Sequence, residues 1–324
     1  MPLSPLPEPD SLPRRLHGLL CALPATLFLV TSLLFFNGLQ AASLLLFPLS
    51  RRVFRAFNRW AADTWWGWCV QAARWFYGTG VVVSGDPLPQ QENAIVIANH
   101  QQMPDITFLM FLARAKHRLG DMKWFVKDVI KYIPGVGWGM LFIDCVFVAR
   151  DWAKDRDSIR RTFARLAENR VPVWLISFPE GTRIDPPKLA RSREYAKKLG
   201  VEPPAHVLLP RTKGFVATVV GLRGHATAVY DVTIGYEQGV PTLWQYIRGL
   251  ARRAHLHVRR YPLAELPMDD AALTAWIFAR FREKDRLLDG FYRSGAFPAQ
   301  GSGEQALSAT FHRRRERSVE EVAR

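Results

Sequence analysis

Apolar positions follow two different patterns along the chain. Residues 16–50 form a stretch of 35 positions without Lys, Arg, Asp or Glu. From about residue 81 onward, short apolar runs alternate with amphipathic segments. About 20 apolar residues suffice to cross a bilayer, whereas short bounded runs are typical of strands in a packed domain. The pattern therefore predicts an N-terminal membrane-embedded segment followed by a globular domain.

The second pattern predicts the fold class of the globular part. Segments with helical periodicity lie between the apolar runs; in KDRDSIRRTFARLAENR, Ile159, Phe163 and Leu166 recur at helical spacing, and TKGFVATVVGL is a second such segment. The runs that we expect to be strands are VVVS, AIVIA, CVFV, PVWLISF, HVLL, ATAVYDVTI and LHVRRY. Together they predict an α/β fold with a mixed sheet flanked by helices.

Basic residues flank the charge-free stretch on both sides, with Arg14 and Arg15 before it and Arg51 and Arg52 after it. Such flanks favour a re-entrant hairpin or two closely paired helices with both ends in the cytoplasm, and a single tilted span is the other arrangement. The next segment, RWAADTWWGWCVQAARWFYG, interleaves tryptophans with arginines. Amphipathic rings beside basic residues are typical of the headgroup layer.

A buried core helix or a cleaved signal peptide would share part of this pattern. Core helices rarely run this long without a charge, and apolar sequence continues through LLLFPL beyond the small residues LQAAS, where a signal would be cleaved. We therefore expect three parts: a membrane anchor over 1–79, a globular domain over 80–297, and a flexible basic tail over 298–324.

Charge and cysteine content narrow the classes of partner. The 44 Lys and Arg against 29 Asp and Glu give a formal net charge of +15. This surplus implies an anionic partner, either nucleic acid or an anionic membrane surface. No nucleic-acid-binding module is recognisable, and the basic residues flank an apolar segment, so we expect membrane phospholipids. Three widely spaced cysteines without CxxC pairing argue against a disulfide framework and a zinc site.

The segment NHQQMPDITFL, residues 99–109, leaves the AIVIA strand through a histidine. Pro104 suits the first turn of a helix, and Asp105 then falls in that turn, near the loop that carries His100. A carboxylate on one imidazole nitrogen fixes the tautomer and supports the imidazolium that forms when the other nitrogen takes a proton. The motif contains no serine or cysteine nucleophile, so the dyad fits activation of a hydroxyl supplied by the substrate. A helix-capping aspartate beside an incidental histidine is the alternative.

Two downstream segments add candidate ligands for an anion. The strand PVWLISF runs into Glu180, Gly181, Thr182 and Arg183, where a glycine allows close backbone approach and an arginine offers a bidentate grip on phosphate. VLLPRTKGF places Arg211 and Lys213 at the start of an expected helix, where free N–H groups favour anions.

At these residues the chain resembles the glycerolipid, or lysophospholipid, acyltransferases typified by 1-acylglycerol-3-phosphate acyltransferase. The first block of that family, N-H-x4-D, is matched by Asn99, His100 and Asp105, and its third block, FPEGTR, appears unchanged at 178–183. Its fourth block, a short apolar run ending in proline, is matched at 207–210. The resemblance covers about half of the chain and implies the glycerolipid acyltransferase fold for the globular domain.

The second block departs from the family pattern. The positions that match it are Gly139, Phe142, Ile143 and Asp144. Cys145 stands where the family has an arginine, and cysteine cannot bind phosphate as a guanidinium does. Arg150 at the end of the same expected strand is the candidate replacement, and a surface charge is the alternative reading. This variant resembles the branch with lysocardiolipin acyltransferase-like enzymes and their bacterial counterparts.

The resemblance implies a membrane-bound enzyme that transfers a fatty acyl group from acyl-CoA or acyl carrier protein to the free hydroxyl of lysophosphatidic acid. His100 is the implied base, Asp105 orients it, and Glu180, Gly181 and Arg183 hold the phosphate region of the acceptor. The implied reaction needs no metal and no cofactor beyond the acyl donor. We expect the cytoplasmic membrane, with the site on or near its cytoplasmic face. Other acceptors such as lysophosphatidylglycerol or lysocardiolipin, and a non-catalytic membrane-bound polyanion binder, are the alternatives.

Overall fold

The computed structural model describes residues 5–149, 151–298 and 305–306. Within these residues one mixed sheet of eight strands runs through the globular part, in the order β4-β3-β5-β2-β6-β7-β1-β8. The strand bounds are Gly80–Gly85 (β1), Ala94–Ala98 (β2), Met122–Lys127 (β3), Val146–Val148 (β4), Trp174–Ser177 (β5), Ala228–Gly235 (β6), Arg253–Pro262 (β7) and Gln305–Ala306 (β8). The expected α/β class with a mixed sheet is confirmed.

Strand direction decides where a site can form. The five neighbours β4, β3, β5, β2 and β6 are mutually parallel, whereas β7 pairs antiparallel with β6 and parallel with β1. The carboxyl ends of β3, β5, β2 and β6 therefore meet at one edge of the sheet. Loops that leave this edge are the ones that carry ligand sites in open α/β sheets.

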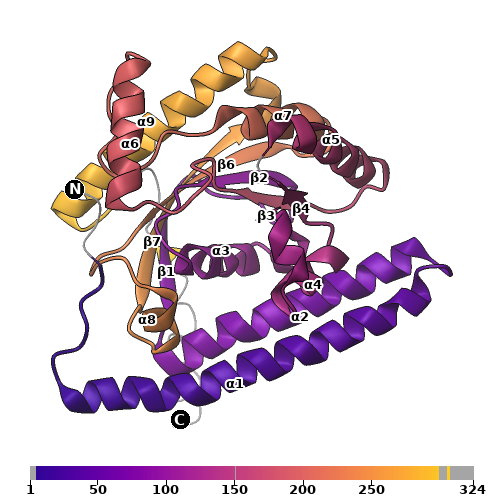
Figure 1. Cartoon of the computed structure of the whole chain (residues 1–324), viewed down its shortest axis with the longest axis horizontal. Coiled ribbons are helices and arrows are strands. Elements are labelled where there is room, and N and C mark those ends of the chain that lie inside the picture. Colours follow the sequence, from indigo (N-terminus) through magenta and orange to yellow (C-terminus); the bar gives the residue numbers. More distant parts are fainter. Residues whose placement is uncertain (1–4, 150, 299–304, 307–324) are drawn as a thin grey trace, which may run out of the picture.

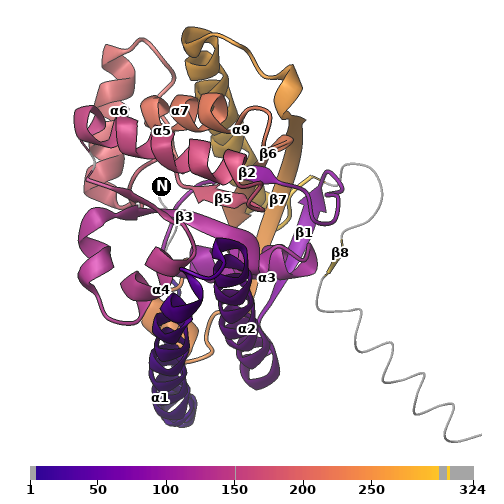
Figure 2. The ribbon, with the colours of Figure 1, turned by 90° about the vertical axis from the view of Figure 1, so that its right-hand side faces the viewer.

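Helices cover both faces of the sheet (Figures 1 and 2). The helix α3 (Pro104–Ala115) lies on one face, and α5 (Trp152–Glu168), α7 (Thr212–Leu222) and α9 (Asp270–Ser294) lie on the other. The two faces form two separate clusters of buried apolar residues, because β2 alternates Ile95 and Ile97 with Val96 and Ala98 toward opposite sides. Burial on both faces explains why β2 is apolar throughout.

Shorter elements complete the domain. The helices are α4 (Val136–Phe142), α6 (Pro186–Lys198) and α8 (Leu243–Ile247), with 3-10 turns η1 (Ser43–Leu46), η2 (Leu119–Asp121), η3 (Asp128–Tyr132) and η4 (Leu263–Glu265). The start of α6 follows from its sequence, because Asp185 caps the helix by accepting a hydrogen bond from Lys188 N at 2.9 Å, with Pro186 in the first turn.

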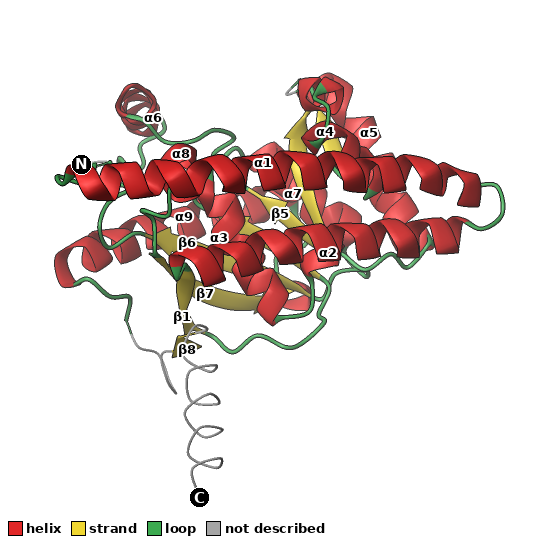
Figure 3. Ribbon diagram, turned by 90° about the horizontal axis from the view of Figure 1, so that it is seen from below, coloured by secondary structure: helices red, strands yellow, loops and turns green. Residues whose placement is uncertain are grey.

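The two N-terminal helices, α1 (Leu12–Ala42) and α2 (Arg51–Tyr77), run side by side in opposite directions beneath α3 (Figures 1 and 3). Polar contacts fix α2 to the domain: the Asp121 carboxylate accepts from both Arg59 and Arg118, and Asp63 accepts from Gly120 N at 3.0 Å. A Cβ at Gly120 would lie 2.6 Å from the carbonyl oxygen of Arg59, so this close approach requires glycine.

The charge-free stretch forms one long helix instead of a hairpin of its own. Its antiparallel partner is α2, which the Trp/Arg segment forms. The apolar helical region Arg15–Leu46 is long and apolar enough to cross a membrane, and only 11% of its most apolar window is buried inside the protein. Side chains such as Leu20, Leu27 and Phe35 are more than 60% exposed.

Two expectations about strands were wrong. HVLL at 206–209 is not a strand, because the N–H groups of Ala205, His206 and Val207 donate to the carboxylate of Asp285 on α9 instead of to a neighbouring strand. Conversely, the sequence pattern did not predict β3, because the two lysines of MKWFVK leave only a short apolar run between them. Most of the expected tail, 299–304 and 307–324, lies outside the described residues.

Candidate active site

The loop after β2 brings His100 and Asp105 together. Asp105 lies in the first turn of α3, and its Oδ2 accepts a hydrogen bond from His100 Nδ1 at 2.9 Å. The side chain of Asp105 is fully buried, whereas that of His100 is 13% exposed and lines a cavity. Because Nδ1 is held by the carboxylate, Nε2 is the ring nitrogen left for proton transfer. The arrangement has the geometry of a histidine base with an orienting acid.

Asp105 has three further hydrogen bonds. Its Oδ2 also accepts from the backbone N–H groups of Gln101, at 2.6 Å, and Gln102, at 2.9 Å. Its Oδ1 accepts from the hydroxyl of Tyr236 at 2.5 Å. Burial, and to a smaller extent the Asp105 carboxylate, raises the pKa of the Tyr236 hydroxyl well above its usual value, so this hydroxyl stays protonated and acts as a donor. The carboxylate is therefore fixed in position by donors on every side.

The loop after β5, which carries FPEGTR, closes over the same edge of the sheet. The ring of Phe178 stacks on the imidazole of His100, with 4.0 Å between centroids and 16° between planes, and the centroid of the Trp124 ring of β3 lies 6.5 Å from that of Phe178. Ile184 N donates to His100 O at 2.9 Å. Gly181 has φ +70°, a left-handed backbone conformation that favours glycine, and it lies against the flexible end of the Arg211 side chain. These contacts fix the plane of the imidazole.

Glu180 occupies a different place from the other residues of its motif. Its side chain is buried, does not line the cavity, and accepts a hydrogen bond from His100 N at 3.0 Å. Burial raises the pKa of this carboxyl well above its usual range. In this structure Glu180 holds the main chain of the loop that carries His100, and a direct contact with the acceptor stays a prediction.

The cationic candidates gather at the cavity. Arg183, Arg211 and Lys213 all line it, as do Gly181 and Thr182. Arg183 Nη1 donates to Gln102 Oε1 at 2.7 Å, which positions the guanidinium beside the loop of His100. Arg211 precedes the first turn of α7, and its N–H donates to Pro179 O at 2.7 Å. The first turn of α7 therefore borders the cavity as well, where its N–H groups favour an anion.

In the second block of the family pattern, the position of the usual arginine is Cys145, which supplies no positive charge to the cavity. This residue is buried in the core beside Trp124 and does not line the cavity, and burial raises the pKa of its thiol to about 12. Asp144 forms ion pairs with Arg55 of α2 at 3.3 Å and Arg165 of α5 at 3.4 Å, so it ties helices to the domain. Arg150, the candidate replacement, lies outside the described residues.

Lys127, at the carboxyl end of β3, also lines the cavity, and sequence reasoning missed it. Once β3 is recognised as a parallel strand, its carboxyl end falls at the edge that carries His100. Tyr236, also missed, directly follows β6, an expected strand whose place beside β2 the sequence did not show. Among the described residues, no group of three or more His, Cys, Asp or Glu side chains could hold a metal ion.

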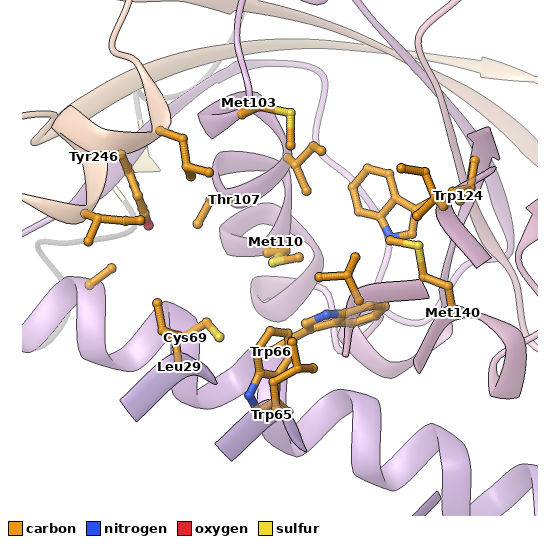
Figure 4. A pocket seen from close by; sticks show the side chains of 18 of the residues that line it. Leu29, Trp65, Trp66, Cys69, Met103, Thr107, Met110, Trp124, Met140 and Tyr246 are labelled. Carbon is orange, nitrogen blue, oxygen red and sulfur yellow. The ribbon is translucent and has the colours of Figure 1, made fainter. Parts of the chain in front are cut away.

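The cavity extends from His100 into an apolar space between the domain and the N-terminal helices. Its volume is about 2380 Å³, far above the roughly 300–1,000 Å³ of ordinary small-molecule pockets. In Figure 4 side chains from α1, α2, α3, α8 and the β3–α4 region point into one space. The labelled residues there are Leu29, Trp65, Trp66, Cys69, Met103, Thr107, Met110, Trp124, Met140 and Tyr246. Size and lining suit long hydrocarbon chains, with the polar dyad at one end.

Comparisons with known proteins agree with this geometry. The family model described as Acyltransferase matches residues 80–237, and one described as Acyltransferase C-terminus matches residues 245–320. The probable 1-acyl-sn-glycerol-3-phosphate acyltransferase 5 of Arabidopsis thaliana is 34% identical over 301 residues, which are 91% of this chain and 78% of that protein. The human 1-acyl-sn-glycerol-3-phosphate acyltransferase delta is 34% identical over 284 residues, covering 86% and 75% of the two chains.

A solved structure shares the fold. The 1-acyl-sn-glycerophosphate (LPA) acyltransferase PlsC of Thermotoga maritima superposes with a TM-score of 0.52 at 19% identity, covering 85% of this chain and 97% of its own. The family models, the identity to the two acyltransferases and the shared fold show that the chain is an enzyme of the 1-acylglycerol-3-phosphate acyltransferase family.

Proposed function

We propose that the protein transfers a fatty acyl group from an acyl thioester, acyl-CoA or acyl carrier protein, to the free hydroxyl of lysophosphatidic acid, forming phosphatidic acid. One observation carries the proposal: a His100–Asp105 dyad stands where a large apolar cavity meets a group of cationic side chains. The names of the relatives support the acceptor, since they are 1-acyl-sn-glycerol-3-phosphate acyltransferases.

The reaction proceeds in a single displacement. His100 Nε2 takes the proton from the acceptor hydroxyl, whose oxygen attacks the carbonyl carbon of the thioester. The C–S bond then breaks, and the imidazolium returns the proton to the departing thiolate. Asp105 stabilises the imidazolium throughout, because its buried carboxylate lies 2.9 Å from Nδ1. No metal is needed in this scheme, and the acyl donor is a co-substrate.

Lys127, Arg183, Arg211 and Lys213 are the proposed ligands of the anionic groups of acceptor and donor. Guanidinium groups match phosphate in a bidentate way, and lysine contributes a point charge. Phosphates held at the edge of the sheet leave the acyl chains to enter the apolar part of the cavity. Burial of a long chain is favourable by about 0.8 kcal/mol per methylene group.

The helices α1 and α2 are the proposed membrane anchor. The most apolar window of α1 is largely outside the core of the protein, and Trp60, Trp68 and Trp75 of α2 are more than 40% exposed. Such rings favour the headgroup layer. Attachment there brings the cavity, which α1 and α2 partly line, to the layer that holds lysolipid and product. The acyl donor would reach the site from the cytoplasmic side.

A panel assay tests the function. The purified protein in phospholipid vesicles is given acyl-CoA or acyl carrier protein with lysophosphatidic acid, lysophosphatidylglycerol or lysocardiolipin, and products are identified by mass spectrometry. We expect phosphatidic acid as the main product and thiol release that depends on the acceptor. Preference for another lysolipid would replace the proposed acceptor, and no product from any pair would favour a non-catalytic polyanion binder.

A further inference from the structure

The outer surface of one part of the catalytic domain is unusually apolar. The η3–α4 segment (residues 128–142) connects β3 to the region before β4. Five of its large apolar side chains are at least 45% exposed and do not line the cavity: Val129, Tyr132, Ile133, Trp138 and Leu141. An apolar patch concentrated in so few residues marks an interaction surface, since single exposed apolar residues are ordinarily scattered.

The opposite side of the segment packs directly on α1. A Cβ at Gly135 would lie 2.9 Å from Leu33 Cδ2, and one at Gly139 would lie 3.4 Å from Gln40 Oε1. Gln40 Nε2 also donates to Gly139 O at 3.5 Å. Gly135, the residue that precedes α4, lets the start of this helix approach α1 closely. The segment therefore lies directly against α1, the helix long enough to cross a membrane.

The charges around the segment suit anionic lipid headgroups. Between Val129 and Ile143 the one charged side chain is Lys131, whose Nζ pairs with Asp128 at 2.7 Å. Arg51 and Arg52, both exposed, begin α2 close by, where Phe54 contacts Phe142 with 6.2 Å between ring centroids. Tyrosine and tryptophan at the rim of an apolar patch, flanked by cations, form the side-chain set of a membrane interface.

We propose that the η3–α4 segment is a second membrane-contact element, inserted into an anionic bilayer with Tyr132 and Trp138 at the boundary between the headgroups and the hydrocarbon chains. The inference rests on the proposed attachment through α1. It gives the catalytic domain its own contact with the lipid. Ile130, Val136 and Met140 of the same segment line the cavity, so one wall of the cavity would stand against the bilayer.

Site-directed spin labelling tests the proposal on the full chain. The three native cysteines are replaced by serine, acyltransferase activity is verified, and single cysteines are introduced as Tyr132→Cys or Trp138→Cys. Phe35→Cys on α1, whose native side chain is 61% exposed, reports the proposed anchor, and Tyr195→Cys, 55% exposed on α6 across the sheet from α1, is the matched aqueous control. Each labelled protein is placed in vesicles of phosphatidylcholine and phosphatidylglycerol, and collision with oxygen and with a water-soluble nickel chelate is measured.

The expected result is that labels at 132 and 138, like that at 35, collide more with oxygen than with nickel, whereas the label at 195 does the reverse. Nickel-accessible labels at 132 and 138 beside a lipid-exposed label at 35 would overturn this inference alone. A nickel-accessible label at 35 would overturn the proposed anchor as well. The product assay tests the acyltransferase reaction and does not depend on either membrane contact. Protection from both reagents, with dipolar broadening between copies, would assign the patch to a second copy of the chain.

Activity on two forms of substrate provides a second readout. Neither Tyr132 nor Trp138 lines the cavity, so Tyr132→Glu and Trp138→Glu are expected to keep kcat on lysophosphatidic acid in detergent micelles. In anionic vesicles the same variants should show a raised KM for the lysolipid, because a charged carboxylate is costly to insert into a bilayer and is repelled by anionic headgroups. Equal loss in micelles and vesicles would point to misfolding, and the matched control Tyr195→Glu should change neither. Unchanged KM in vesicles contradicts the proposal.

Discussion

Asp105→Asn isolates the charge of the dyad from its shape. Asp105 Oδ2 accepts from His100 Nδ1, Gln101 N and Gln102 N, and Oδ1 accepts from Tyr236. An asparagine can place its carbonyl oxygen where Oδ2 lies and its amide toward the Tyr236 hydroxyl, which can accept as well as donate. The hydrogen bonds to Oδ2 and the histidine tautomer are then retained, the contact with Tyr236 reverses its direction, and the negative charge is lost.

The expected cost follows from the distance. Two unit charges about 4 Å apart, the approximate separation of a carboxylate and an imidazolium in contact, interact by about 4 kcal/mol at an effective dielectric constant of about 20. At about 1.36 kcal/mol per factor of ten, kcat should fall by about a thousandfold. The variant should keep its fold, because the donors of His100, Gln101 and Gln102 still have an acceptor.

The assay measures thiol release from acyl-CoA with lysophosphatidic acid, together with thermal unfolding in detergent. Asp105→Ala is the contrast: it leaves the donors of His100, Gln101 and Gln102 without their acceptor, so it should lose both activity and stability. An Asp105→Asn enzyme that is folded and within about tenfold of wild-type kcat would refute the charge argument, since about 1.4 kcal/mol is far below the expected loss. Loss of activity that simply tracks unfolding would assign Asp105 to helix capping.

Four further outcomes are expected. His100→Ala should lower kcat by about 100- to 10,000-fold without unfolding the protein, and near wild-type turnover would exclude it as the base. Arg183→Lys should raise KM for the lysolipid, because an ammonium lacks the planar fork; unchanged acceptor kinetics would move this arginine to another role. Glu180→Gln keeps an acceptor for His100 N–H. Because burial raises the pKa of Glu180 in the folded protein, the wild type loses stability as the pH rises above the pKa that this carboxyl has in the unfolded chain. Melting curves compared across pH should therefore show the variant gaining stability relative to the wild type toward neutral pH. Burial lowers the pKa of His257 to about 4, so the wild type should lose stability as pH falls from about 6.5 to 4, and His257→Gln should flatten that loss; parallel curves would contradict it.

Local sequence was sufficient for the elements whose signals are local. The AIVIA strand is buried on both faces and reads as apolar throughout, and Pro104 with Asp105 marks the start of α3. A histidine five residues before that aspartate can reach it only across a short loop, so the pairing of His100 with Asp105 could be predicted from spacing. The long charge-free run equally predicts the long apolar helix α1, because its length and composition are those of a helix that could cross a membrane.

Contacts between distant segments required the tertiary structure. HVLL has the composition of a strand, but Asp285, about 80 positions away, takes its N–H groups, and nothing local encodes that competition. In the same way, the burial of Glu180 behind His100 and the hydrogen bond from Tyr236 to Asp105 arise because β5, β2 and β6 are neighbours in the sheet.

The apolar cavity and the η3–α4 surface are also tertiary properties. Apolar residues of α1, α2 and α3 read alike in sequence whether they fill a core or line a space. Their role depends on the docking of α2 through Asp121 and of α4 through Gly135, contacts between segments dozens of positions apart. Periodicity along the chain specifies which face of an element is apolar, whereas only the packing of elements decides whether that face meets protein, a ligand or the membrane.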